Sequence, residues 1–448
     1  MRTMSAMSDD ESAPGTGPLA TPSSPRTYLF VLTDAGGTVP PELGVVRRLV
    51  DRGHHVTVLS QESMADLVRQ TGASYLPGTS DAAGAFRDCE LKTPMSLARG
   101  MAEHMISGPA PGQARDTAAA IEAIEPDLVV TSAFAVGGMI AAEAHGVPYD
   151  VLLPNVYPLP APGMPPFGAG LSPARGPLGR MRDRVLGPAG GRLFDRYALA
   201  QVNEVRAEHG LDPIATTWSQ QLGARRLLVL TSAAFDFPAT LPENARYVGP
   251  ILDDPAWAAD TAWTAPAGDG PLVLVAMSST FQDHVDCLQR ISDAVGILPV
   301  RGLVTTGPAV AADAIRAPGN VTVVTSAPHR EVMRQADLVV THGGHGTVIK
   351  TLAAGLPLVI LHHGRDQADN AVRVTTRGAG VAVSRRASAE KIARAIAEVL
   401  GDPGYRRAAA ELGAIVARDA AGTVLVDELE QVAPPESREV DRPGVLGS

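Results

Sequence analysis

Short apolar runs alternate with segments of helical periodicity along most of this chain. In the first half, the residues from 42 to 53 carry apolar side chains at helical spacing and separate two apolar runs. The runs that predict strands in this half are 27–33, 54–60, 126–132, 149–155 and 225–232. Strands that alternate with helices are typical of parallel sheets with crossover helices. The first half is therefore predicted to form one doubly wound α/β unit.

The second half repeats this pattern, beginning with the continuous apolar run of residues 271–280. A strand without polar alternation is expected to be buried on both faces of a parallel sheet. Further strand patterns include 301–307, 320–326, 337–344 and 356–363, with helical patterns between them. The predicted fold is thus α/β, with two Rossmann-like parallel-sheet domains that face each other.

Stretches rich in Pro, Gly and charged residues divide the chain into the following predicted parts. They are a disordered leader at 1–26, a first domain at 27–235, a linker at 236–270, a second domain at 271–415, a C-terminal helix at 416–433 and a disordered tail at 434–448. Residues 156–185 are also rich in Pro and Gly, which favours a long surface loop that covers a pocket.

Composition narrows the class of protein. The 448 residues are 45% hydrophobic and 19% charged, which is too long and too apolar for a single core. A net charge of −10 disfavours a nucleic-acid partner, because phosphate binding needs clustered Lys and Arg. Cys89 and Cys287 stand far apart without metal or redox spacing, which suits a reducing cytoplasm. No run is long and apolar enough to predict a membrane span, and the leader lacks the apolar core of a signal peptide.

The clearest chemical signal is THGGHGT at residues 341–347, between a predicted buried strand and a predicted helix. Glycines allow close approach of a ligand to the backbone, and the helix start offers unpaired N–H groups to a diphosphate. The alternative is a plain tight turn, since such turns are common in these folds. Two further polar pairs favour a ligand site, because Ser279-Thr280 and Asp366-Gln367 follow other strands of the same predicted sheet.

The segments HGGHGT (342–347), LAAGLPLVI (352–360) and GRDQADNA (364–371) resemble the donor signature of the UDP-glycosyltransferase-like family, especially its bacterial natural-product members. The resemblance implies the GT-B fold, an acceptor on the first domain, a nucleotide sugar on the second, and inverting transfer without a metal. It implies that His342, Gly343, Gly344, Gly346 and Thr347 surround the diphosphate. It further implies that Asp366 and Gln367 hold the sugar, that Ala327 and His329 border the base, and that the last helix returns to the first domain.

The first Gly-rich turn departs from the family pattern. The family places a histidine base where this chain has Thr38, and the aspartate that orients it where this chain has Ser132. A threonine hydroxyl is a poor general base near neutral pH, whereas imidazole titrates there. The usual dyad is therefore predicted to be missing as a unit.

Three explanations stay open. In the first, the acceptor needs no strong base, as with an amine or an acidic phenol. In the second, another residue acts as the base, and Asp34, Glu42 and His104 are the candidates. In the third, the chain binds the donor without turnover. A sugar-nucleotide epimerase and an auxiliary protein of a partner transferase are the alternative functions.

Within loop 156–185, Tyr157, Met164 and Phe167 favour a lid over an apolar acceptor.

The remaining expectations concern metal and partners. His342, His345, His362 and His363 raise the question of a zinc site, but zinc sites usually include Cys or carboxylates. We therefore expect no metal and no cofactor beyond the sugar donor, which is a TDP- or UDP-sugar. The expected partners are this donor and a small apolar acceptor in the cytoplasm, with a homodimer as the candidate assembly.

Overall fold

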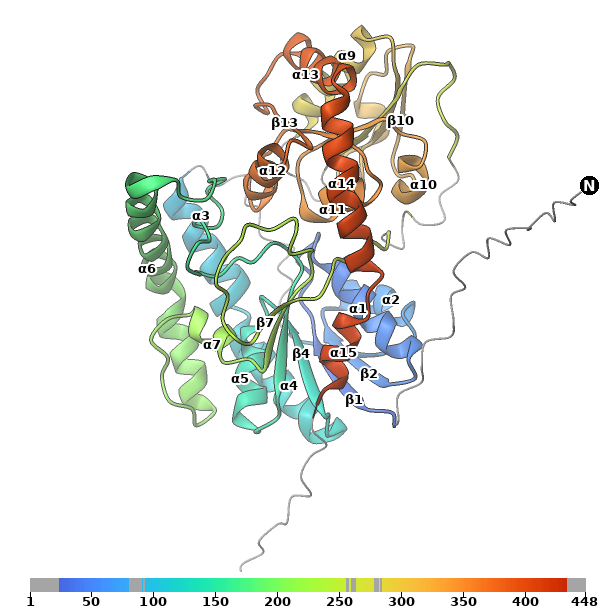
Figure 1. The fold of residues 1–448 in the computed structure, drawn as a ribbon. Helices are drawn as coiled ribbons and strands as arrows, with labels where there is room; N and C mark the ends of the chain where they lie inside the picture. Colours follow the sequence, from blue (N-terminus) through green and yellow to red (C-terminus); the bar gives the residue numbers. More distant parts are fainter. Residues whose placement is uncertain are drawn as a thin grey trace, which may run out of the picture.

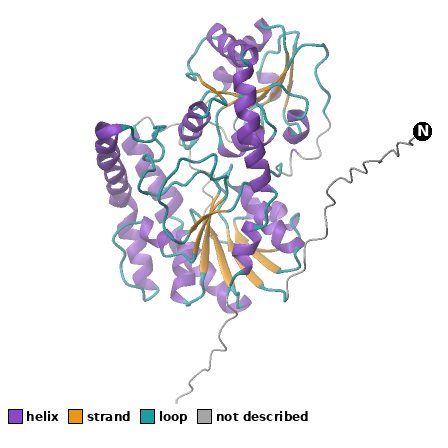
Figure 2. Cartoon of the chain, in the orientation of Figure 1, coloured by secondary structure: helices purple, strands orange, loops and turns teal. Residues whose placement is uncertain are grey.

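The computed structural model describes residues 24–79, 91, 93–254, 258, 263–277, 282 and 284–432. Ser279, Thr280, Cys89, most of the predicted leader and the whole predicted tail lie outside these residues. The described chain forms two lobes, each built around one sheet (Figures 1 and 2).

The first lobe contains a seven-stranded sheet in the order β3-β2-β1-β4-β5-β6-β7, in which every neighbouring pair is parallel. Its strands are β1 (Thr27–Val31), β2 (His55–Ser60), β3 (Ser74–Pro77), β4 (Leu128–Ser132), β5 (Tyr149–Leu153), β6 (Arg226–Val229) and β7 (Ala245–Tyr247). Its helices are α1 (Val39–Asp51), α2 (Ala65–Arg69), α3 (Pro94–Met101), the π-helical η4 (Ala102–Ser107), α4 (Ala110–Ile124), α5 (Val136–Ala144), α6 (Gly176–Glu208) and α7 (Trp218–Leu222). Strands β4 and β5 are fully buried, as is β1 after Thr27, so this sheet is the centre of the lobe.

The second lobe contains a six-stranded parallel sheet in the order β10-β9-β8-β11-β12-β13. Its strands are β8 (Leu272–Ala276), β9 (Arg301–Thr305), β10 (Val321–Val324), β11 (Leu338–Thr341), β12 (Leu358–Ile360) and β13 (Gly380–Ala382). Its helices are α9 (Val285–Ile297), α10 (His329–Met333), α11 (His345–Ala353), α12 (Gln367–Thr376) and α13 (Ala389–Gly401). In each lobe, the strand order reverses next to the strand that comes first in the chain. Ligands bind at such a reversal in doubly wound sheets.

The carboxyl edges of the two sheets face each other. Val156, which follows β5, packs into a buried cluster with Val348 of α11 and Ile360 of β12. Phe235, which follows β6, belongs to the same cluster, and its ring centroid lies 5.9 Å from that of His345. Loops at the carboxyl ends of one sheet are therefore buried against the helices that begin at the carboxyl ends of the other.

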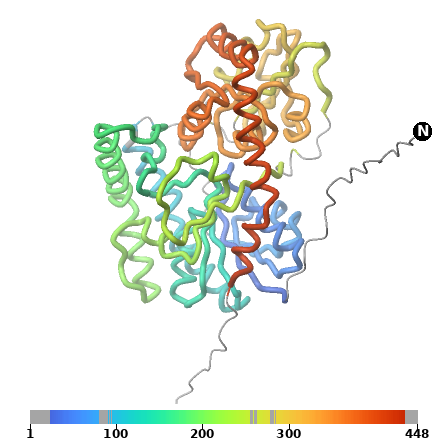
Figure 3. The backbone as a smooth tube through the Cα atoms, in the orientation of Figure 1, coloured from blue at the N-terminus to red at the C-terminus, as the bar shows by residue number. Residues whose placement is uncertain are grey.

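The C-terminal helices join the lobes a second time. Helix α14 (Pro403–Ala420) leaves the second lobe, and α15 (Val424–Glu430) packs on the first, as the red end of the tube in Figure 3 shows. Leu429 lies in the same buried cluster as Leu43 of α1, and Arg52 forms a bidentate ion pair with Glu430. The helix that returns to the first domain is α15. The helix that leads to it, α14, begins at Pro403, which is earlier than the start predicted for the C-terminal helix.

Three elements differ from the sequence-based expectations. Strand β7 lies in the segment predicted as the linker, so the first sheet extends to Tyr247. The predicted loop 156–185 was too long, because α6 begins at Gly176. Pro177 occupies its first turn, where no intrahelical N–H is required, and the Arg, Leu and Met residues that follow favour a helix. Strand β13 (Gly380–Ala382) is not among the strand patterns predicted from the sequence.

Candidate active site

The Gly-rich turn after β11 is shaped by two glycines that pack inside the protein and one that does not. Gly343 has a φ of +94°, and a Cβ there would lie 2.8 Å from Cγ2 of Ile360. A Cβ on Gly344 would lie 2.5 Å from Nε2 of His342, so the imidazole lies directly over this glycine. Gly346 is exposed, and a Cβ there would meet no atom within 4 Å. Gly343 is therefore required by the fold, whereas a Cβ on Gly344 would displace only the imidazole of His342 and one on Gly346 would displace nothing.

Helix α11 presents unpaired amides at this turn. Gly344 is its N-cap residue, and the first amide bonded within the helix is that of Val348, which donates to the carbonyl of Gly344. The amides of His345, Gly346 and Thr347 therefore have no partner within the helix. No acidic residue lies in the first turn, so nothing on the helix itself opposes an anion. This arrangement matches the anion site predicted from THGGHGT.

His342 is a neutral side chain in this environment. Burial, followed by the nearby His363 and His284, lowers the pKa of His342 to about 3. The hydroxyl Oγ1 of Thr341 lies 3.4 Å from its Nδ1. An imidazole in this state contributes a hydrogen bond rather than a positive charge. At this turn His342 therefore adds no positive charge to the dipole of α11 and the nearby guanidinium of Arg365.

Asn370 of α12 connects this turn to the neighbouring helix, and the sequence analysis did not identify it. Its side chain is fully buried; Nδ2 donates to the carbonyl of Gly343 at 3.0 Å and to Oδ2 of Asp366 at 2.7 Å. Its Oδ1 lies 3.3 Å from Nδ1 of His345. The signal that could have revealed it is helical spacing, because Asn370 follows Asp366 by one turn on the same face.

Asp366 and Gln367, the predicted sugar contacts, have different surroundings. Gln367 is buried, its Oε1 accepts hydrogen bonds from the amides of His363 and Gly364, and its Nε2 donates to Oε1 of Gln282. Its amide group therefore shapes the turn before α12. Asp366 is partly exposed at the start of α12, which leaves its carboxylate the more accessible of the pair. A contact between either residue and a sugar stays a prediction.

The predicted border of the base follows β10, which is separated from β11 by β9 and β8. Ala327 is buried, and His329 begins α10, with Nε2 3.0 Å from Oγ1 of Thr305 at the end of β9. Burial lowers the pKa of His329 to about 4, so this ring is also neutral near pH 7. The structure thus brings these residues to the same edge of the sheet as the Gly-rich turn.

The four predicted catalytic candidates of the first domain lie on different elements. The N-cap residue of α1 is Thr38, and Ser132 at the end of β4 is buried and accepts a hydrogen bond from the amide of Phe134. The carboxylate of Asp34 accepts from the hydroxyl of Ser63 at 2.7 Å, and His104 is exposed on η4. Within the described chain, the hydroxyl of Thr38 is buried without a hydrogen-bond partner, so it is not bonded to Ser132. A catalytic role for each of the four stays a prediction.

Glu42, one turn after Thr38, gives a test by pH. Burial alone raises the pKa of Glu42 well above its usual range. Between the ordinary carboxyl pKa of about 4.3 and this raised pKa, the native state holds a proton that the unfolded state releases. Native stability therefore falls as pH rises through that window. Glu42→Gln should remove this loss, so its advantage in the free energy of unfolding should grow with pH, by at most about 1.4 kcal/mol per pH unit. Urea denaturation at a series of pH values measures it, and parallel pH profiles would contradict it.

The residues predicted as an acceptor lid have mixed exposure. Tyr157 and Met164 are buried in a cluster with side chains of β4, β5 and β6, whereas Phe167 is 41% exposed. The backbone of this loop is held by Asp369 of α12, whose carboxylate accepts from the amides of Gly168 at 2.6 Å and Gly170 at 3.2 Å. The loop is thus tied to the second domain, and its contact with an acceptor stays a prediction.

Asp369→Ala tests this tie. The substitution removes the acceptor of both glycine amides, and a hydrogen bond to a charged group contributes about 1.5–3 kcal/mol. We expect hydrogen exchange at Gly168 to accelerate about ten- to a hundredfold, because opening of the loop no longer breaks these bonds. Exchange at Gly343, which Asn370 holds, serves as the internal control. Unchanged exchange at Gly168 would mean that the loop is held by other contacts.

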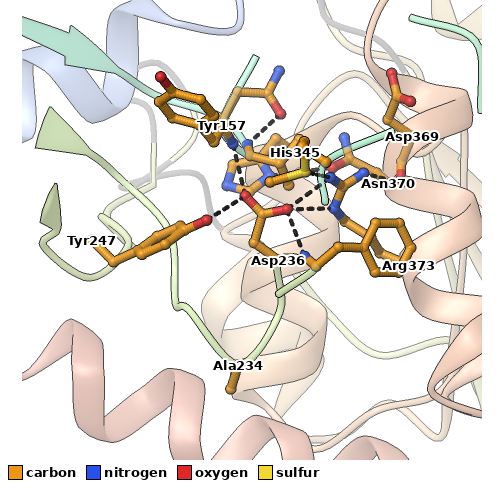
Figure 4. A network of polar contacts seen from close by, with 12 residues as sticks. Tyr157, Ala234, Asp236, Tyr247, His345, Asp369, Asn370 and Arg373 are labelled. Carbon is orange, nitrogen blue, oxygen red and sulfur yellow. Dashed lines mark hydrogen bonds and ion pairs between the residues drawn. The ribbon is translucent and has the colours of Figure 1, made fainter. Parts of the chain in front are cut away.

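A buried ionic network joins the domains beside the turn (Figure 4). Asp236 accepts hydrogen bonds from Nε and Nη2 of Arg373 at 2.9 and 2.7 Å, and the exposed fraction of both side chains is at most 2%. Its carboxylate also accepts from the amides of Tyr157 and Phe237 and from the hydroxyl of Tyr247. Because Arg373 lies one turn after Asp369 and close to Asn370, this network fixes α12 relative to the first domain.

The histidines near the Gly-rich turn do not form a metal site among the described residues. His345 lies against Phe235 and His362 is exposed, and the described residues contain no group of three His, Cys, Asp or Glu side chains arranged to hold a metal ion. None of the described helices combines the length and the hydrophobicity that a membrane crossing requires.

Comparisons with known proteins agree with this arrangement. Residues 293–432 match the family described as the C-terminal domain of erythromycin biosynthesis protein CIII-like proteins. The chain is 30% identical over 414 residues to 4'-demethylrebeccamycin synthase of Lentzea aerocolonigenes, covering 88% of this chain and 96% of the relative. Its fold is similar to that of the kitacinnamycin glycosyltransferase, with a TM-score of 0.73 at 24% identity, covering 92% of this chain and 99% of that one. It is also similar to a spinosyn rhamnosyltransferase complexed with thymidine diphosphate, with a TM-score of 0.65 at 20% identity, covering 90% and 100%.

Two facing parallel-sheet domains, with a Gly-rich turn at a helix start of the second, form the GT-B fold, and the relatives identify the chain as a glycosyltransferase. The chain belongs to the bacterial natural-product branch of the UDP-glycosyltransferase-like family. The resemblance stated from the donor signature is therefore confirmed, as are the fold class and the assignment as a glycosyltransferase. The epimerase alternative receives no support from these relatives.

Proposed function

We propose that this enzyme transfers a sugar from a TDP- or UDP-sugar to a small apolar natural product, with inversion at the anomeric carbon and without a metal. The observation that carries the proposal is the start of α11, where three consecutive amides lack helical partners beside the buried His342. The spinosyn rhamnosyltransferase of similar fold is known with thymidine diphosphate, which supports a nucleoside diphosphate as the leaving group here.

The chemistry follows from where negative charge develops. As the bond between the anomeric carbon and the phosphate oxygen breaks, charge grows on the diphosphate. The amides of His345, Gly346 and Thr347 point toward that charge with fixed orientation, and no acidic side chain of the first turn opposes it. The imidazole of His342, neutral before donor binds, adds a hydrogen bond. This stabilisation acts on the transition state more than on the bound donor, which is what accelerates the reaction.

The acceptor side of the proposal lacks the usual histidine and aspartate. Thr38 has a hydroxyl where the imidazole is expected, and the hydroxyl oxygen of Ser132 already accepts a hydrogen bond from the amide of Phe134. These two side chains cannot act together as a general base and its orienting carboxylate. We therefore propose transfer without that dyad. The alternative of a donor-binding auxiliary protein has no observation in its favour.

An assay of purified enzyme tests the proposal. TDP-glucose, TDP-rhamnose and UDP-glucose are each incubated with a panel of indolocarbazole, phenol and macrolide aglycones in the presence of EDTA. Mass spectrometry detects the product, and NMR coupling at the anomeric proton gives its configuration. We expect full activity in EDTA and an anomeric configuration opposite to that of the donor. Activity that returns only when Mg²⁺ is added, or retention of configuration, would overturn the proposal.

A further inference from the structure

The first half of α6 carries a stripe of apolar side chains that face the solvent. Its members, each between 45% and 80% exposed, are Leu178, Met181, Val185 and Leu186. At the repeat of an α-helix the four lie within an arc of about 140°, so they form one face of the helix. Single exposed apolar side chains are ordinary, whereas a contiguous group of them marks a surface that contacts something else.

The described chain does not cover this stripe. The residues that α6 buries all lie in its second half, from Ala198 onward, and each residue from 176 to 190 is exposed or partly exposed. The stretch also contains Gly179, Gly187 and Pro188, which are poor helix formers. In Figure 1 this half of α6 stands at the outer edge of the first lobe, beside α3. Because most helices are stabilised by packing of their apolar face, the stripe is expected to have a partner.

The charge of this segment is opposite to that of the protein. Residues 175–196 contain six arginines and two aspartates, although the whole chain has a net charge of −10. Arg180 and Arg184 are exposed, lie one turn apart and border the stripe along one side. Asp183 is already paired with Arg182 at 2.7 Å, so it does not neutralise them. An apolar face with an arginine border is typical of helices that lie on anionic membrane surfaces.

The size of the stripe favours a lipid surface over a protein partner. A stable protein interface takes about 20–30 residues from each side, whereas the stripe and its two bordering arginines lie on a few turns of a single helix. A symmetric contact between two copies would also bring the same arginines together. A lipid surface needs no matching shape, because apolar side chains enter the boundary between headgroups and acyl chains while guanidinium groups pair with phosphates.

We propose that the first half of α6 docks this enzyme on a bilayer that contains anionic lipids. The helix lies along the surface, with Leu178, Met181 and Val185 inserted and with Arg180 and Arg184 on the lipid phosphates. Because α6 follows directly on the loop predicted to cover the acceptor, docking places that loop beside the lipid, where apolar compounds accumulate. This consequence for the acceptor rests on the proposed function, whereas the docking itself does not.

Flotation of the full-length enzyme with lipid vesicles, without donor or acceptor, tests the docking. We expect binding to vesicles of mixed phosphatidylglycerol and phosphatidylcholine, and little binding to phosphatidylcholine alone. Val185→Asp should weaken binding at least about tenfold, because it replaces an inserted apolar side chain by a charge. Ile297→Asp is the matched control, since Ile297 at the end of α9 has the same exposed fraction of 58% but lies in the second lobe.

A second variant tests the arginines without touching the stripe. Each arginine near an anionic lipid surface contributes about fivefold to binding, so the double variant Arg180→Gln with Arg184→Gln should bind about twenty- to thirtyfold more weakly. Raising the salt concentration should weaken binding of wild type more than binding of this variant. Because all these side chains are exposed, thermal denaturation should give every variant the Tm of wild type.

The possible failures are distinguishable. Wild-type enzyme that does not float with the anionic vesicles, or equal losses for Val185→Asp and Ile297→Asp, would overturn the docking. Light scattering should give wild type and Val185→Asp the same mass; a lower mass for the variant would mean that the stripe joins two copies of the chain, which also overturns it. An enzyme that binds these vesicles as expected but transfers no sugar would contradict the proposed function and still confirm the docking.

Discussion

Replacing Gly346 with proline should weaken TDP binding by about ten- to a hundredfold without unfolding the enzyme. The substitution removes one amide from the start of α11, and a hydrogen bond to a charged group contributes about 1.5–3 kcal/mol. Proline is tolerated in the first turn of a helix, as Pro40 and Pro41 in α1 illustrate. A Cβ at Gly346 meets no atom within 4 Å, and this residue is exposed.

Gly346→Ala is the matched control for this prediction. Alanine adds the same Cβ but keeps the amide, so the difference in TDP affinity between the two variants isolates the N–H group. Calorimetric titration gives the affinities, and thermal denaturation should give closely similar melting temperatures for both. Equal TDP affinity in the proline and alanine variants would show that this amide does not contact the diphosphate.

The second large effect is expected at the ionic network between the domains. Asp236→Asn leaves the guanidinium of Arg373 buried without its counter-charge, and loss of one partner of a buried pair costs about 3–5 kcal/mol. Arg373→Met should lower the free energy of unfolding by less. The carboxylate of Asp236 still accepts hydrogen bonds from the amides of Tyr157 and Phe237 and from the hydroxyl of Tyr247. Urea denaturation measures both losses.

The double variant Asp236→Asn with Arg373→Met completes a mutant cycle. If the pair acts as described, the double variant should be more stable than Asp236→Asn alone, because no unpaired charge is then buried. Simple addition of the two single losses would contradict direct coupling. Since α12 also carries Asp369 and Asn370, the single variants should in addition weaken TDP binding.

The sequence predicted the sheets better than the segments that join them. The continuous apolar runs predicted at 126–132 and 271–280 contain the buried parallel strands β4 and β8, because burial on both faces leaves a plain hydrophobic signal. Strand β7, three residues long at the edge of its sheet, has no such signal. The start of α6 was missed because the Gly and Pro residues near it are tolerated in a first turn.

The candidate site was predictable where backbone chemistry decides it. Gly343 and Gly344 appear in the structure as the positions where a Cβ would collide, in line with the Gly-rich motif. Asn370 and Arg373 were missed because their importance comes from partners distant in sequence, such as Gly343 and Asp236. The state of Glu42 was equally hidden, since the sequence gives its position on a helix but not the absence of donors around it.

The most direct test of this account is a crystal structure of the enzyme with TDP. We predict that the β-phosphate oxygens lie within hydrogen-bond distance of the amides of Gly346 and Thr347, with the imidazole of His342 facing the diphosphate. A diphosphate bound elsewhere, for example at the turn after β1, would contradict the central claim that the start of α11 stabilises the leaving group.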